Sequence, residues 1–300
     1  MSDATLILGG TTSLAGPLLF VGLGELIAER AGTINLSVEG MMLGSAVGAA
    51  MISDISGSSL LAVVGGIVCG WLIAMAQAVL SHRLTLNQFV VGIALNIFVL
   101  GLTSYLLDIQ QYVPQSIGKV ALVGLSDIPL VGKPFFDQCP FFYGLFLLIP
   151  YVWWLLWRSR WGLEIQAAGE NPEAASTSGV AVNHRRRQAI GACGLCAGFG
   201  GAYLSLGVVG SVSPNMTAGT GYIAIAAVIF GVWTVKGTVA GCLLFGAAEA
   251  LQLTLPAIGL ALNSQLLTAA PYVLAIIAMA FFAGRKRGPA SLGITFEPIT

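Results

Sequence analysis

The stretch AGTINLSVEGMMLGSAVGAA, residues 31–50, combines a membrane-spanning helix with polar residues at its start. From Met41 onward its side chains are apolar or small, which is typical of a buried helix. Its first turns carry polar side chains at alternate positions: Thr33, Asn35, Ser37 and Glu39. A charged residue near the centre of a bilayer costs on the order of 3 kcal/mol. These residues therefore need a structural or a functional reason to be there.

The composition of the whole chain is that of a polytopic membrane protein. Hydrophobic residues make up 56% of the 300 residues, and charged residues only 9%, against about 25% in soluble domains. We expect an all-α fold, because backbone that faces lipid must satisfy its own hydrogen bonds. The formal net charge is zero, which does not suggest a nucleic-acid partner. Five cysteines are scattered through apolar runs, which argues against a disulfide framework.

Apolar runs near the spanning length of roughly 20 residues predict eight or nine transmembrane segments. The eight longer runs fall at about 11–28, 33–53, 59–80, 86–107, 141–157, 188–208, 236–256 and 266–284. A ninth run, at 219–233, is short, and the sequence leaves open whether it spans or re-enters the membrane. G-x-x-x-G spacings at four places in the chain predict close helix packing. They are Gly40/Gly44/Gly48, Gly66/Gly70, Gly194/Gly198 and Gly237/Gly241.

The distribution of Lys and Arg predicts the orientation of the loops. Eight of the thirteen basic residues lie in the 158–187 loop and the tail: Arg158, Arg160, Arg185, Arg186, Arg187, Arg285, Lys286 and Arg287. The 108–140 loop carries only Lys119 and Lys133. We therefore expect 158–187 and the C-terminus to be cytoplasmic and 108–140 to be external.

The polar start of the 31–50 stretch has two interpretations. In the first, it is an ordinary helix start at the membrane surface, where the helix dipole favours Glu39. In the second, Gly32 breaks a helix and a half-helix starts inside the protein, as in transporters. Residues 221–250 share this order of elements, with a break at Gly231–Gly237, so two weakly similar halves are expected.

The second interpretation makes the polar residues inside the spans candidates for the substrate pathway. The candidates are Asn35, Ser37, Glu39 and Asn96. Asn96 could equally join two helices by a hydrogen bond. Glu39 could instead bind neighbouring backbone and hold the break open. Glu25 and Glu29, with Arg30, are interpreted as a helix end.

The 158–187 loop contains a short capped helix. Asn171 followed by Pro172 is an N-cap and N1 pair, and Gly179 follows the run PEAASTS at a C′ position. Such a helix between two spans, with basic flanks, suits docking into a groove of a soluble partner.

These motifs together resemble a known family. GENPEAASTSGV, with the basic cluster and GACGLCAGFGGAYL after it, resembles the coupling-helix loop of bacterial ABC-importer permeases. ERAGTINLSVEGMMLGSA and GSVSPNMTAGTGYIAIAAVIFG are similar to segments of the ribose/branched-chain amino acid permease family, in its nucleoside and simple-sugar branch. The resemblance covers roughly 11–285. Two departures are Ser176–Ser178, where the family often has a basic residue, and VWTVKG after IFG.

The resemblance implies a single permease domain over 1–300, which is multi-pass in a bacterial inner membrane. It implies three partners: a cytoplasmic ATPase, a second permease subunit (expected to be a paralogue) and an external substrate-binding lipoprotein. The cargo would be a nucleoside or a related sugar-like solute. Residues expected to couple to the ATPase are Gly169, Glu170, Asn171, Pro172, Glu173, Ala174, Ala175, Gly179, Arg185, Arg186 and Arg187.

Other functions are less well supported by the residues. The chain has no P-loop motif, so ATP would bind to the partner, and we expect no cofactor, metal site or catalytic residue in this chain. A simple sugar such as ribose is an alternative cargo. A stand-alone secondary transporter would need ionisable groups in the membrane, for which only Glu39 and Glu249 are good candidates. Enzyme motifs such as H-E-x-x-H and G-x-S-x-G are absent.

Overall fold

The computed structural model describes residues 3–122, 132–257 and 288–297, with a few single positions between these ranges. The expected span at 266–284, apart from single positions, and the basic residues 285–287 lie outside the described residues. The described part is mostly helical, and seven of its helices are long and apolar enough to cross a membrane. The all-α polytopic fold predicted from composition is confirmed.

The helices follow the predicted spans closely. The seven long ones are α1 (Asp3–Arg30), α2 (Val38–Ser56), α3 (Ser59–His82), α4 (Gln88–Ile109), α6 (Pro140–Arg158), α9 (Val182–Tyr203) and α11 (Val235–Ala257). A π-helical segment, η1 (Leu204–Val209), continues α9, and the short apolar helix is α10 (Thr220–Phe230). The loop between α4 and α6 holds a short helix, α5 (Gly132–Phe136), and a two-stranded antiparallel sheet of β1 (Val120–Ala121) and β2 (Asp137–Gln138).

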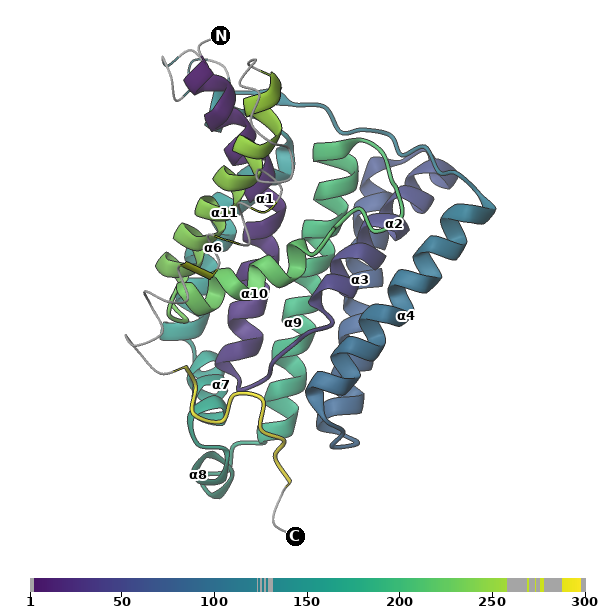
Figure 1. Ribbon diagram of the computed structural model, residues 1–300. Helices are drawn as coiled ribbons and strands as arrows, with labels where there is room; N and C mark the ends of the chain where they lie inside the picture. The colour runs from purple at the N-terminus through teal and green to yellow at the C-terminus, as the bar shows by residue number, and fades with distance from the viewer. Residues whose placement is uncertain are drawn as a thin grey trace.

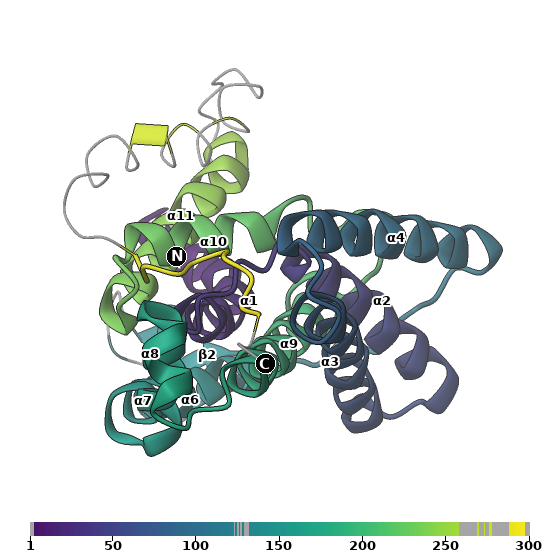
Figure 2. The same ribbon diagram turned by 90° about the horizontal axis from the view of Figure 1, so that it is seen from below.

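The bundle is arranged around α1 and α9. Helix α1 packs against α9, α10 and α11, while α9 also packs against α2 and α3 (Figure 2). Figure 1 shows that α2 starts well inside the bundle, and that α10 lies across the bundle at the same level. The two helices α7 (Arg160–Glu170) and α8 (Pro172–Thr177) lie at the lower end, beyond the long helices. The 219–233 run is therefore a half-helix that does not cross the bundle by itself.

Glycines at G-x-x-x-G spacing bring α3 and α9 into backbone contact. A Cβ atom added to Gly70 would lie 2.7 Å from the Cα of Gly198 and 2.9 Å from the carbonyl oxygen of Gly194. The Ser45 hydroxyl of α2 also donates a hydrogen bond to the Gly198 carbonyl. Close packing of this kind replaces the hydrophobic drive that lipid does not provide.

We expect Gly70→Ala to destabilise the bundle, because the new methyl group meets backbone atoms that are not free to move. Overpacking of this kind costs about 1–3 kcal/mol. Gly101→Ala in α4 is the matched control, since a Cβ atom there meets nothing within 4 Å. Thermal unfolding in detergent measures the difference. Equal unfolding temperatures for the two variants would contradict the proposed role of Gly70.

Candidate functional site

A left-handed glycine separates α1 from α2. Helix α1 ends at Arg30, and Gly32 adopts a φ of +83°, a conformation that side chains disfavour. A Cβ atom at Gly32 would also lie 2.9 Å from Nη2 of Arg186. The predicted break at Gly32 is thus present, and only glycine fits it without strain.

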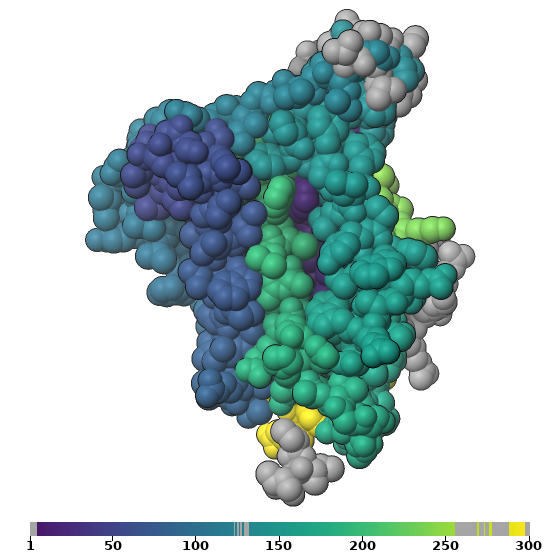
Figure 3. Space-filling view, turned by 180° about the vertical axis from the view of Figure 1, so that it is seen from behind, coloured from purple at the N-terminus to yellow at the C-terminus, as the bar shows by residue number. Residues whose placement is uncertain are grey.

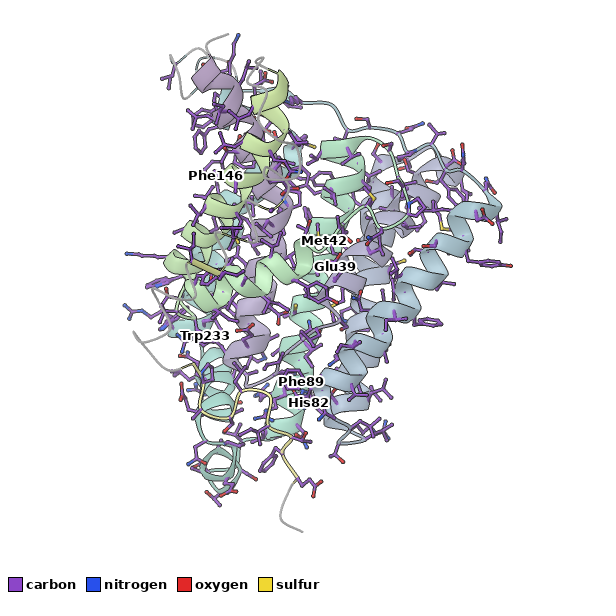
Figure 4. All side chains as sticks on the ribbon, viewed as in Figure 1. Glu39, Met42, His82, Phe89, Phe146 and Trp233 are labelled. Atoms are coloured by element: carbon purple, nitrogen blue, oxygen red, sulfur yellow. The ribbon has the colours of Figure 1, made fainter. Side chains whose placement is uncertain are left out.

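The first residues of the segment from Thr33 to Ser37 are held by side chains from other helices. The Thr33 hydroxyl lies 3.0 Å from Nε2 of His82, and the Ile34 N–H donates to Oε1 of Gln88 at 3.1 Å. Both contacts come from the lower ends of α3 and α4. Figure 4 labels His82 there, together with Phe89, which follows Gln88 in the sequence. The break is therefore a rigid link between α1 and α2.

Glu39 joins the start of α2 to the start of α10. Its Oε1 accepts hydrogen bonds from the Thr217 hydroxyl at 2.5 Å and the Gly219 N–H at 2.8 Å. Its Oε2 accepts the Gly221 N–H at 2.7 Å. The residue is only 4% exposed and lies at the middle of the molecule (Figure 4). A surface helix start is therefore wrong: Glu39 lies inside the bundle in the first turn of α2 and binds the donors at the start of α10.

Asn35 and Ser37 lie next to this cap and bind protein groups. The Asn35 amide donates to Oε2 of Glu25 at 3.2 Å and contacts the Cys193 thiol at 3.4 Å, while the Ser37 hydroxyl donates to Oδ1 of Asn35 at 2.8 Å. Asn35, Ser37 and Glu25 are 0% exposed. The expectation that Asn35 and Ser37 face a cavity is corrected: in this structure they hold the break to α1 and α9.

The fourth candidate, Asn96, reaches the same level of the bundle from α4. Its amide donates to the hydroxyl of Tyr222 in the first turn of α10. Tyr222 is 40% exposed, so this pair presents an aromatic ring and polar groups at the surface beside the half-helix starts. Sequence reasoning missed Tyr222, in the apolar 219–233 run, and Thr217 just before it, because nothing local marks them as partners of α4 and α2.

The second predicted break, at Gly231–Gly237, is bound to the end of α1. Val232 and Trp233 have φ values of 52° and 51°, which is strained backbone for such large residues. The Trp233 indole N–H donates to Glu29, and Nε of Arg30 donates to the Trp233 carbonyl at 2.8 Å. Glu29 and Arg30 do mark a helix end, as predicted, and they also anchor the second break.

A groove on the described part of the molecule faces away from these breaks. Figure 3 shows it between α6 and α9, with α1 at its base. Its volume is about 880 Å³, and its lining is almost wholly apolar, with Phe20, Leu148, Leu195 and Phe199 among the lining residues. A groove without polar partners does not suit a polar solute. The junction of α2 and α10 is therefore the better candidate for a solute path.

The capped helix predicted in the 158–187 loop is α8. Oδ1 of Asn171 accepts the Ala174 N–H at 3.0 Å, Pro172 is the first helical residue, and Gly179 has a φ of +87°. Glu173, Ala174 and Thr177 are exposed, whereas Ala175 is buried among Ala168, Val182 and Phe296. The prediction that Ala175 lies on the docking face is therefore wrong.

The three arginines of the basic cluster have different surroundings. Arg185 forms a salt bridge with Glu164 at 2.5 Å, and Arg187 donates to the Asn183 carbonyl of its own helix at 3.3 Å. Arg186 is 0% exposed. Of the three, Arg186 is thus not available to an external partner, which corrects its predicted role in docking.

We expect Glu39→Gln to destabilise the protein, because one amide NH₂ would face an N–H donor. Leaving a buried donor unsatisfied costs about 1–3 kcal/mol, and Glu39→Ala should cost more. Asp108→Asn, at an exposed carboxylate near the end of α4, is the control. Thermal unfolding in detergent is the measurement. A wild-type unfolding temperature for Glu39→Gln would exclude the capping role.

Comparison with known proteins agrees with this architecture. The chain matches the family model described as "Branched-chain amino acid transport system / permease component" over residues 7–283. It is 41% identical to a Haloferax volcanii protein with a provisional name as a glucose ABC transporter permease, over 88% of this chain and 82% of that protein.

Two further relatives carry nucleoside names. The nucleoside ABC transporter permease protein NupC of Lactococcus lactis subsp. cremoris is 32% identical, over 93% of each chain. The guanosine ABC transporter permease protein NupQ of Bacillus subtilis is 29% identical, over 97% of this chain and 96% of its own. The chain thus belongs to the family of permease components of branched-chain amino acid transport systems.

Proposed function

We propose that the chain is the transmembrane subunit of an ATP-binding-cassette importer that carries a nucleoside or a related sugar-like solute across the cytoplasmic membrane. The observation that carries this proposal is the exposed, capped helix α8 between two spans in a chain of the permease family. ABC permeases act with a separate ATPase and a substrate-binding protein. A second, paralogous permease subunit and an external lipoprotein complete the proposed assembly, and this chain itself forms one permease domain.

The proposed orientation follows from the position of α8. The C-terminal segment 288–297 contacts α7, since the Ser291 N–H donates to the Gly169 carbonyl at 2.9 Å. The loop and this segment therefore share one side of the membrane, and the positive-inside rule makes that side cytoplasmic. The first turns of α1 lie at the opposite end of the bundle (Figure 1), so they face the exterior.

The proposed solute site is the pair of half-buried Asn96 and exposed Tyr222 beside the starts of α2 and α10. The Tyr222 ring can stack on a nucleobase or on the C–H face of a sugar, and the Asn96 amide can bind a ribose hydroxyl. Asn35, Ser37 and Glu39 are buried, and they position the starts of α2 and α10 next to this pair. Three protein donors already bind the two carboxylate oxygens of Glu39. Ion coupling through this carboxylate is therefore not favoured over ATP-driven transport.

We expect Ala174→Asp to abolish or weaken association with the ATPase while the bundle stays folded, because Ala174 is exposed on α8. Ala175→Asp has a different effect: it buries an unpaired carboxylate, so it should lower the unfolding temperature. Co-purification of the ATPase and thermal unfolding separate the two variants. If Ala174→Asp binds the ATPase and transports like wild type, α8 is not the coupling element.

We expect Tyr222→Phe to retain most of the uptake and Tyr222→Ala to lose it, because stacking depends on the ring. Base–aromatic stacking contributes about 1–3 kcal/mol where it has been measured, so Tyr222→Ala should reduce uptake about tenfold. Tyr105, exposed further along α4, provides the control Tyr105→Ala. Uptake of radiolabelled guanosine and glucose into proteoliposomes is the measurement. Equal uptake by Tyr222→Ala and wild type would place the solute path elsewhere.

A further inference from the structure

Arg186 lies where three separate segments of the chain meet. Its guanidinium donates Nε to the carbonyl of Ala31 at 3.0 Å, Nη2 to that of Ala168 at 3.1 Å and Nη1 to that of Ile294 at 2.6 Å. These carbonyls belong to the Gly32 turn, the last turns of α7 and the C-terminal segment. We refer to Arg186 with these three partners as the Arg186 junction.

The charge of Arg186 holds the junction together. Among the residues that the structure describes, the one salt bridge joins Arg185 to Glu164, so backbone carbonyls alone meet the Arg186 cation. Ala31 follows the end of α1, and Ala168 lies in the last turn of α7. Helix C-termini carry partial negative charge that favours a cation. A buried charge is costly without such partners, which keeps the two helix ends together.

Close backbone packing makes the junction stiff. A Cβ atom on Gly169 would lie 2.2 Å from the Arg30 carbonyl oxygen, so α7 and the end of α1 touch without side chains between them. The C-terminal segment adds two hydrogen bonds: the Ser291 N–H donates to the Gly169 carbonyl at 2.9 Å, and the Gly293 N–H donates to the Gly32 carbonyl at 3.0 Å. The C-terminal segment thus binds both α7 and the turn at Gly32.

The junction connects the proposed docking helix to the proposed solute site. On one side, α7 runs directly into α8 through Asn171. On the other side, Gly32 leads through the held residues 33–37 to Glu39 and the start of α10. A displacement of α8 therefore reaches Glu39 through contacts that leave little freedom between them.

We propose that Arg186 is a positioning residue that transmits movement of α8 to the 31–39 break, and that the C-terminal segment keeps this contact closed during transport. This inference rests on the proposed function. A purely structural role for Arg186 would stabilise the fold without affecting how much solute moves for each ATP hydrolysed.

The test is the complete transporter, with its ATPase and binding protein, in proteoliposomes. Arg186→Lys retains the charge but loses the planar fork that reaches three carbonyls. We expect uptake per ATP hydrolysed to fall about tenfold, within the range of coupling between sites, while the ATPase stays bound and active. The control is Arg83→Lys, at an exposed arginine after α3, which should retain the wild-type ratio. A wild-type ratio in Arg186→Lys would overturn the proposal.

A second measurement keeps the test decisive if Arg186→Lys does not assemble. A chain ending at residue 287 retains Arg186 and loses the segment that contacts Gly169 and Gly32. In wild type, nucleotide should change hydrogen exchange at 31–37, and in both variants this response should be lost. An unchanged response in the shortened chain, with a wild-type uptake ratio, would refute the proposal. Failure of the wild-type complex to couple uptake to ATP would instead refute the proposed function.

Discussion

The carboxylate of Glu39 is the interaction on which the central part of the structure depends. It lies at the N-termini of two half-helices, α2 and α10, where the partial positive charges of both helix ends favour an anion. Three hydrogen bonds hold α10 to it. Without this group, the Gly219 and Gly221 N–H groups at the start of α10 would lose their acceptor inside the bundle, which is costly in a low-dielectric interior. These hydrogen bonds therefore offset the cost of placing the charge of Glu39 inside the bundle.

The remaining buried charges connect this centre to the cytoplasmic end proposed above. Glu29 and Arg30, at the end of α1, bind Trp233 in the second break. Arg186 binds the end of α1 to α7. Each of these groups bridges an interrupted helix to another segment. These charged residues thus lie beside the points where the backbone departs from regular helix, because that is where backbone donors and acceptors lack helical partners.

Much of the candidate site could be predicted from the sequence, since its elements depend on local signals. The break at Gly32, the caps of α8 at Asn171 and Gly179, and the paired interruptions all follow from glycine, proline and polar residues at short spacing. The roles of single side chains could not be predicted in this way. Asn35 and Ser37 read as solute contacts, yet they bind Glu25 and each other, because α1 and α9 pack against the break. Ala175 reads as a docking residue, yet Phe296, far along the chain, covers it.

The sequence by itself determined the membrane class, the positions of the described spans and the existence of two interrupted helices, because hydropathy and glycine spacing act over one element at a time. Only the tertiary structure decided which helix ends meet. Glu39 finds its donors in Thr217, Gly219 and Gly221, some 180 residues later. Arg186 likewise finds acceptors in Ala31 and Ile294, 155 and 108 residues away, as well as in Ala168 of α7. A buried charge requires partners, but only the packing of the whole bundle selects them.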